Sequence, residues 1–332
     1  DNINSLIRFL LSKYCKIESW KGGKVSAPLE YPEVGLYHPK LIKKITINYS
    51  NLPKNKFKKF TIGLILMRSY VLSSDTKHYD YVIKELESLG VEVIPVFSGG
   101  LDARPAIEKY FFDKENCIID ALISLTGFSL VGGPAYNDSK SAVEILKRLN
   151  VPYLSAHPLE FQTISQWSRS QIGLGPIETT MLVALPEIDG ATNPTVFAGR
   201  EDKNENKSFK VDGNKYNLKE MLPCSSRVKL LAKRSIKLAN LRKTSNSEKK
   251  VAIIIFGFPP NSGSIGTAAY INVFKSLFNT LVAMKKDGYS VELPENHEQL
   301  RDIIIEGNSK AYGQEANVQD FVDADKILNQ TP

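Results

Sequence analysis

The chain has 332 residues, of which 42% are hydrophobic and 24% charged, and its formal net charge is +7. These values are ordinary for a globular protein and leave room for two domains, while no apolar run reaches the length that crosses a bilayer. The three cysteines lie far apart, which argues against a disulfide framework and excludes the close spacing of zinc or redox motifs.

Seven lysines lie between residues 40 and 59. They predict either an acidic partner, such as a nucleic acid, or a solvated lysine-rich surface. The solvated surface is favoured, because no basic and aromatic recognition module accompanies the lysines. The chain begins at Asp1 without Met and ends at Pro332 with no clear stop, so we interpret it as a piece of a longer protein.

Residues 3–14 have the spacing of an amphipathic helix, and residues 20–39 are rich in Gly and Pro, as in a connector. Strands and helices then alternate. Strands are predicted at 61–67, 91–97, 118–125 and 151–156, and helices at 79–89, 103–112 and 139–149, the last capped by Asp138 or Ser139. This alternation is typical of a doubly wound α/β unit with a parallel sheet.

The predicted strands end in glycines and polar residues. Asp102 follows the second strand, Thr126 and Gly127 follow the third, and His157 follows the fourth. In an open parallel sheet, ligands bind beyond the carboxyl ends of the strands. These residues therefore predict one cleft lined from several strands, although such residues are also ordinary in the loops of any α/β protein.

Residues 165–185 are predicted to be mostly helical, a short strand follows at 196–200, and residues 201–220 form a polar surface excursion. A basic helix at 227–242 and a polar linker at 243–250 lead to a domain boundary. We therefore predict a helical connector segment at 1–55, a Rossmann-like α/β domain at 56–242, and the start of a second α/β domain at 243–332.

The second unit opens with the apolar run 251–256, which predicts a buried parallel strand. Turn residues follow, then a helix over 267–286 that ends before Gly288, and a further strand at 290–293. Gly263 and Gly266 precede this helix, whose free N–H groups could hold an anion. No Lys-Ser or Lys-Thr pair follows, which excludes a nucleotide P-loop and leaves a tight strand-to-helix turn as the alternative.

Several motifs share their order with one protein family. They are GLYHP at 35–39, EKYFF at 108–112, SLTGFSLVGGPA at 124–135, VALPEIDG at 183–190, VFAGR at 196–200 and FGFPPNSGSIGTAAYINVF at 256–274. Together they resemble the large, porphyrin-binding subunit of magnesium chelatase and its cobaltochelatase relatives. AHPLEFQT at 156–163 and VELP at 291–294 resemble the bacteriochlorophyll-type branch more than the plant type.

The resemblance implies a subunit that holds protoporphyrin IX while Mg²⁺ is inserted. ATP is then hydrolysed by a partner AAA+ subunit, and a third subunit completes the complex. Protoporphyrin IX and Mg²⁺ are the substrates in this scheme, and neither nucleic acid nor a transmembrane segment takes part. The implied location is the plastid stroma, with the bacterial cytoplasm as the alternative.

Metal insertion requires oxygen ligands that guide Mg²⁺ and a base that accepts the two pyrrole N–H protons. Glu292 and Glu295 are the candidate carboxylates, with Glu295 as the candidate metal ligand. His157 and the two glutamates are the candidate bases, and Asp102 is a weaker choice. Each residue is also ordinary as an exposed polar group or a helix cap, and Glu295 suits the start of a helix over 298–305.

Three other functions stay open at this point. A cobaltochelatase large subunit fits the same motifs, because the metal cannot be chosen from these residues. A non-catalytic tetrapyrrole-binding or signalling protein could be built on the same fold. A general α/β nucleotide-binding domain is disfavoured, because the phosphate-binding motifs are missing.

Overall fold

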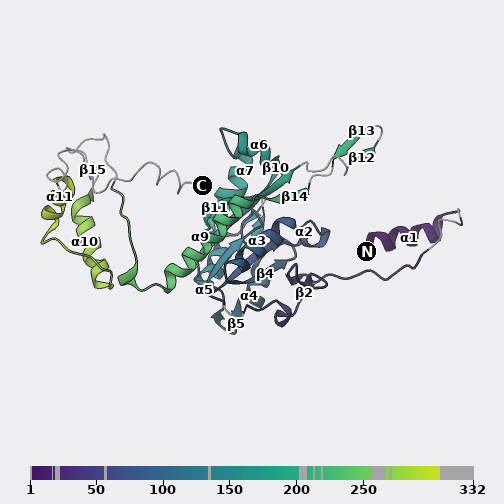
Figure 1. Cartoon of the computed structure of the whole chain (residues 1–332), viewed down its shortest axis with the longest axis horizontal. Helices are drawn as coiled ribbons and strands as arrows, with labels where there is room; N and C mark the ends of the chain where they lie inside the picture. Colours follow the sequence, from purple (N-terminus) through teal and green to yellow (C-terminus); the bar gives the residue numbers. More distant parts are fainter. Residues whose placement is uncertain are drawn as a thin grey trace. The chain divides into compact units, whose positions relative to one another are not determined.

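The computed structural model of the chain describes residues 2–16, 18, 23–55, 58–133, 136–201, 208–211, 214–217, 220–255, 267–268 and 271–306 (Figure 1). The chain divides into two compact units, Asp1–Ala239 and Asn240–Pro332. Among the described helices, none combines the length and the apolar character needed to cross a membrane.

An eight-stranded sheet forms the centre of the first unit, in the order β14-β11-β10-β7-β3-β4-β1-β2. The five strands from β11 to β4 are parallel to one another, and antiparallel strands flank them on both sides. The doubly wound parallel sheet predicted from the sequence is therefore confirmed. The strands are β1 (Val34–Tyr37), β2 (Ile45–Thr46), β3 (Phe60–Met67), β4 (Val91–Ser98), β7 (Ala121–Ser124), β10 (Tyr153–Thr163), β11 (Thr192–Glu201) and β14 (Glu220–Pro223).

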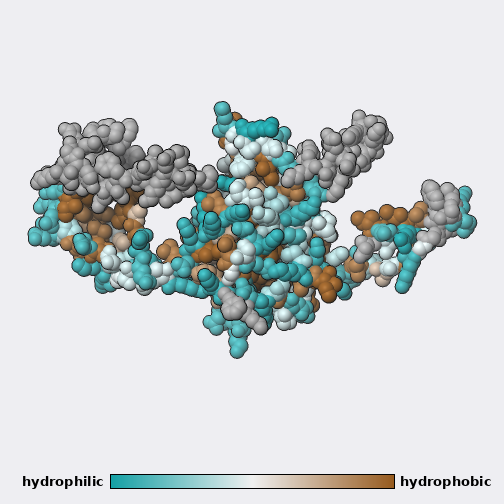
Figure 2. Space-filling model, viewed as in Figure 1, coloured by the Kyte–Doolittle hydropathy of each residue, from teal (hydrophilic) through white to brown (hydrophobic). Residues whose placement is uncertain are grey.

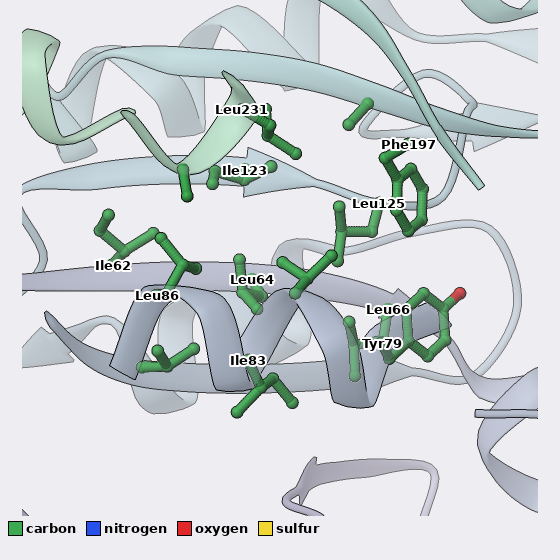
Figure 3. Packing of buried hydrophobic residues seen from close by; sticks show 14 of the residues in the cluster. Ile62, Leu64, Leu66, Tyr79, Ile83, Leu86, Ile123, Leu125, Phe197 and Leu231 are labelled. Atoms are coloured by element: carbon green, nitrogen blue, oxygen red, sulfur yellow. The ribbon is translucent and has the colours of Figure 1, made fainter. Parts of the chain in front are cut away.

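Helices cover both faces of this sheet, which explains why its central strands are apolar on both sides. On one face, α2 (Arg68–Ser73), α3 (Lys77–Ser88) and α9 (Ser225–Lys243) contribute buried side chains to a core shared with β3 and β7. Figure 3 shows Tyr79, Ile83 and Leu86 of α3 packed against Leu64 and Leu66 of β3 in this core. On the other face, α4 (Arg104–Tyr110) and α5 (Ser139–Leu149) pack on the same strands.

The helix α5 shows how local sequence sets these boundaries. The Asp138 side chain accepts a hydrogen bond from the Ser141 N–H at 3.0 Å, which caps the first turn. Asn150 ends the helix in the left-handed conformation, with φ of 48°. Of the two predicted caps, Asp138 is thus the one observed, and an asparagine ends the helix where glycine is more common.

The chain order of the parallel strands creates a switch point. From β3 the chain moves outward to β4, then returns past β3 to β7 and continues to β10 and β11. The connections on the two sides of β3 therefore diverge, which opens a crevice at the carboxyl ends of β3 and β7. Met67 ends β3 and Ser124 ends β7, so these residues mark the crevice.

The remaining elements of the first unit are short, apart from α1. They are α1 (Asn2–Tyr14), η2 (Tyr49–Asn51), β5 (Phe112–Asp113), β6 (Asn116–Cys117), β8 (Gly132–Gly133), β9 (Tyr136–Asn137), α6 (Ile164–Arg169), α7 (Pro176–Thr179), the π-helical turn η3 (Thr180–Ala184), α8 (Leu185–Ile188), β12 (Ser208–Val211) and β13 (Asn214–Asn217). Apolar side chains of α1 are exposed, among them Ile3 at 75% and Leu6 at 55% (Figure 2).

Two predictions for the first unit were wrong in part. The connector predicted at 20–39 contains the strand β1, which pairs antiparallel with β4. The strand β1 forms because it pairs with a partner that lies far along the chain, where Val34 is opposite Ser98. The helix predicted over 165–185 is broken into α6, α7 and η3, because Gly173, Gly175 and Pro176 interrupt it.

In the second unit, the strand predicted at 251–256 is absent over its described residues 251–255, and Ile254 is 93% exposed. A buried strand needs partners for its N–H and C=O groups, and the described part of the chain provides none here. The strand predicted at 290–293 is also absent. The described elements are η4 (Asn246–Glu248), β15 (Thr267–Ala268), β16 (Ile271–Asn272), α10 (Val273–Lys286) and α11 (His297–Glu306).

The helix α10 begins at Val273 rather than at 267, because residues 267–272 include the short paired strands β15 and β16. Its predicted end is confirmed. Gly288 has φ of +87°, and its N–H donates to the Lys285 carbonyl at 3.1 Å. Glycine is suited to this position because it adopts positive φ without steric cost.

Candidate functional site

Two loops meet above the carboxyl end of β3. One follows β4 and the other follows β7, the neighbours of β3 on either side. The Ala103 N–H donates to the Leu130 carbonyl at 3.0 Å, and the Gly132 N–H donates to the Leu101 carbonyl at 2.8 Å. These bonds join the two loops into an arch, defined here as residues 99–103 and 126–133.

Glycine is required at one position of this arch. Gly132 has φ of +103°, and a Cβ atom built there would lie 2.0 Å from the carbonyl oxygen of Tyr136. No side chain fits at such a distance, so the first glycine of the GGPA motif has a backbone role. Gly127, at φ of +73°, places a virtual Cβ 3.1 Å from the Cβ of His157, so this turn is also closely packed.

A first hollow lies beneath the arch. It is lined by the ends of β3, β4 and β7, with hydroxyl groups from Ser98, Ser124, Thr126 and Ser129 and the side chain of Asp102. Its cavity volume is about 30 Å³, which is room for about two water molecules. The first hollow is therefore too small for a macrocycle.

A second hollow shares Thr126 and Phe128, from the loop after β7, with the first hollow. Its cavity volume is about 510 Å³. This volume is within the range of roughly 300–1,000 Å³ for small-molecule sites. Its apolar wall comes from Met67, Tyr70, Phe128, Pro158 and Leu182, and its polar wall includes Ser69, Ser73, Asp75, Thr126, Glu160 and Arg200. The second hollow thus combines an apolar wall with a few polar groups, as ligand sites do.

Arg200 ties the polar wall of the second hollow together. Its Nε lies 2.9 Å from Glu160 Oε2, and one terminal nitrogen lies 3.5 Å from Asp75 Oδ2. The guanidinium also lies 6.0 Å from the centroid of the Tyr70 ring. Arg200 thereby links the ends of β10 and β11 to the segment after α2, and it fixes the shape of this wall.

Thr126, Gly127 and Asp102 lie together at this crest, as predicted. Thr126 lines both hollows, and its Oγ1 lies 2.9 Å from Ser124 Oγ and accepts from the Phe128 N–H at 3.3 Å. Asp102 lines only the first hollow, where its Oδ2 accepts from an Arg104 terminal nitrogen at 2.7 Å. Whether these residues contact a ligand stays a prediction.

His157 lies on β10 but does not line either hollow. It is 1% exposed, and both ring nitrogens lack a hydrogen-bond partner among the described residues. Burial lowers the pKa of His157 to about 4, with a further contribution from the positive charge of Arg227. The imidazole is therefore neutral at pH 7 and shielded in this conformation, and its role as a base stays a prediction.

The other predicted site residues belong to the second unit. Glu292 and Glu295 are exposed, and the Glu295 N–H donates to Gln299 Oε1 at 2.6 Å. Asn296 accepts from the Gln299 N–H at 2.9 Å and so caps α11, with Glu295 just before it. Gly263 and Gly266 lie outside the described residues. The structure brings no group of three His, Cys, Asp or Glu side chains together in its described part, so it gives no metal cluster there.

Several residues of the crest were missed as site candidates. Arg200 and Glu160 were noted only as parts of motifs, and Asp75 was not assigned a role. Glu160 and Arg200 share a signal of position, because each lies near the carboxyl end of its strand, whereas Asp75 follows the helix α2. Asp189 was missed too, since nothing in its local sequence shows that it is 1% exposed.

The fold and its crest define a doubly wound α/β domain with an apolar, polar-rimmed hollow at the carboxyl edge of its sheet. The chain belongs to the CobN/magnesium chelatase family, whose model matches residues 1–330. The magnesium-chelatase H subunit of Cereibacter sphaeroides is 52% identical over 336 residues, covering 100% of this chain and 28% of that protein. The chloroplastic magnesium-chelatase protein ChlH of Oryza sativa subsp. indica is 38% identical over 321 residues, covering 92% of this chain and 22% of that protein.

A solved structure has the same fold. The catalytic subunit of cobaltochelatase from Mycobacterium tuberculosis aligns with a TM-score of 0.66 and 21% sequence identity, covering 93% of this chain and 24% of that chain. The chain thus spans about a quarter of the length of the proteins it resembles. At this identity the alignment establishes the fold alone.

Proposed function

We propose that the chain is a segment of the porphyrin-binding subunit of a magnesium chelatase that inserts Mg²⁺ into protoporphyrin IX. The observation that carries the proposal is the 52% identity to a bacterial magnesium-chelatase relative along the whole chain. The lower identity to the rice relative, 38%, favours the bacteriochlorophyll-type branch and a bacterial cytoplasmic location over the plastid stroma.

In this proposal the second hollow contacts one part of the macrocycle. Tyr70 and Phe128 provide aromatic surface, and Leu182 and Pro158 provide aliphatic surface, for a flat apolar ligand. Arg200 and the two carboxylates beside it form the polar rim, where charged substituents of a ligand would lie. Protoporphyrin IX and Mg²⁺ are substrates, and ATP is hydrolysed by a partner subunit, with a third subunit in the complex.

The described residues do not themselves form a metal cluster. We therefore expect the isolated chain to bind porphyrin weakly and to insert no Mg²⁺, even with partner subunits and ATP. Formation of magnesium protoporphyrin by the isolated chain would show that the whole reaction centre lies within these 332 residues.

Two aromatic variants of the full-length subunit test the placement of the macrocycle. Phe128→Ser removes an aromatic ring from the second hollow, and Phe161→Ser removes a ring that is 66% exposed and lies outside it. An aromatic contact contributes about 1 kcal/mol beyond its buried area, so Phe128→Ser should weaken protoporphyrin binding at least about fivefold. Equal dissociation constants for both variants, measured by fluorescence quenching, would place the macrocycle elsewhere.

A further inference from the structure

We propose that Asp189 is a positioning residue that fixes the loop 126–133 and thereby sets the shape of the second hollow. The ligand named in this inference rests on the proposed function, whereas the effect on the loop does not. Asp189 follows α8, far along the chain from the loop. Its carboxylate lies 2.5 Å from Ser129 Oγ and accepts from the Leu130 N–H at 2.8 Å.

One carboxylate contacts the loop and the short strand β9 that follows it. Oδ2 binds Ser129 and Leu130 within the loop, and Oδ1 lies 3.4 Å from Asn137 Nδ2 on β9. Further along the loop, Gly132 has positive φ. Because glycine lowers the cost of other backbone conformations, the loop needs ties from outside to keep one shape.

Asp189 itself is held firmly. It is 1% exposed, and its N–H donates to the Pro186 carbonyl at 3.2 Å. The neighbouring Gly190 N–H donates to the Glu187 carbonyl at 2.9 Å, which completes the turn after α8. The position of the acceptor is therefore set by contacts other than those with the loop.

The charge on Asp189 is the informative feature. No Lys, Arg or His of the described residues forms an ion pair with this carboxylate. A buried carboxylate without a counter-ion is costly unless several donors converge on it. Here the donors come from the loop, so the aspartate is explained by the need to order that loop rather than by packing.

The loop in turn shapes the site. Thr126 and Phe128 line both hollows, and they stand only a few residues before Ser129 and Leu130. A shift at the Asp189 contact therefore moves the aromatic ring and the hydroxyl that face a ligand. Loss of the carboxylate should weaken binding of a flat ligand while leaving the chemistry of the bound complex nearly unchanged.

The test uses the full-length subunit with three substitutions. Asp189→Asn keeps the size of the side chain and removes its charge, and Ser129→Ala removes only the hydroxyl that binds it. Asp113→Asn is the matched control, because Asp113 is exposed on β5, away from both hollows. Each protein is measured for hydrogen exchange of residues 126–133, protoporphyrin IX affinity, and chelation rate at saturating porphyrin with partner subunits.

For Asp189→Asn we expect about tenfold faster exchange of residues 126–133 and a dissociation constant about tenfold higher, with the saturated rate within about twofold. Ser129→Ala should show smaller changes in the same direction, and Asp113→Asn none. Unchanged exchange in Asp189→Asn would overturn the proposal. A reduced saturated rate with unchanged affinity would also overturn it, because Asp189 would then act on the reaction itself.

Two further outcomes are decided by the same design. If Asp189→Asn does not fold, Ser129→Ala becomes the deciding variant, and unchanged exchange and affinity in that variant overturn the proposal. If the unmodified subunit fails to bind protoporphyrin IX, the proposed function is refuted. The exchange measurements then still decide whether Asp189 orders the loop.

Discussion

The substitution Gly132→Ala should destabilise the first unit far more than Gly100→Ala, although both glycines lie in the arch at positive φ. Gly132 has φ of +103°, and an added Cβ would lie 2.0 Å from the Tyr136 carbonyl oxygen. Gly100 has φ of +69°, and an added Cβ would meet no atom within 4 Å. Comparing the two variants therefore separates the cost of the backbone conformation, which both share, from the cost of a steric contact, which only Gly132→Ala has.

The expected magnitudes follow from these contacts. Alanine at Gly100 costs about 1 kcal/mol, the usual penalty for the left-handed region. At Gly132 the backbone lies outside that region, which costs about 1–3 kcal/mol. Relief of the Cβ contact must also displace the N–H that donates to Leu101, at about 1 kcal/mol more. The two variants should therefore differ by about 2 kcal/mol in stability.

Thermal unfolding of the chain, followed by circular dichroism, measures this difference. For a unit of this size, 1 kcal/mol shifts the midpoint by about 2–4 °C, so Gly132→Ala should melt about 4–8 °C below Gly100→Ala. Equal midpoints would refute the reasoning, because the close approach to Tyr136 would then have no energetic consequence.

Two further predictions concern titrating groups. The pKa of His157 is about 4 in the folded chain, below its ordinary value of about 6.5, so protonation favours the unfolded state. The contribution of His157 to stability should therefore be complete above about pH 6.5 and should fall by about 3 kcal/mol at pH 4. His157→Met should flatten the decline of stability with falling pH in urea titrations, and an unchanged slope would contradict the assignment. In the full-length subunit, Glu295→Gln should reduce chelation at low Mg²⁺ and leave porphyrin affinity nearly intact, since the amide keeps the size but loses the charge. Unchanged turnover would remove Glu295 from the site, and a lower melting temperature alone would assign it to the start of α11.

The central strands of the sheet could be predicted because the local sequence of each one has the pattern of a buried strand. The run Phe60–Met67 is apolar except for Thr61, as is typical of a strand covered on both faces, and Gly90 at φ of +81° follows the helix that packs on it. The run at 251–255 has the same composition but forms no strand. The local sequence sets the β propensity of a segment, but the segment forms a strand only where it can pair with neighbouring strands.

The site was harder to predict, because its contacts join distant parts of the chain. Arg200 meets Glu160 and Asp75 only after β10, β11 and the segment following α2 have been placed side by side. Asp189 meets Ser129 across 60 positions of sequence. Gly127 was predicted as a residue of the cleft, whereas its positive φ of +73°, which favours glycine, is known only from the structure.

The edges of the main sheet have a consequence for aggregation. One edge is β2, with two residues, and the other is β14, with four residues ending at Pro223, which has no N–H to donate. An incoming strand finds few free backbone groups at either edge. The short antiparallel strands pair with only part of the parallel strands beside them, β1 with Val96–Ser98 of β4 and β14 with Ala198–Glu201 of β11. The short strands therefore protect the carboxyl ends of β4 and β11, where the two hollows lie, against the addition of another strand.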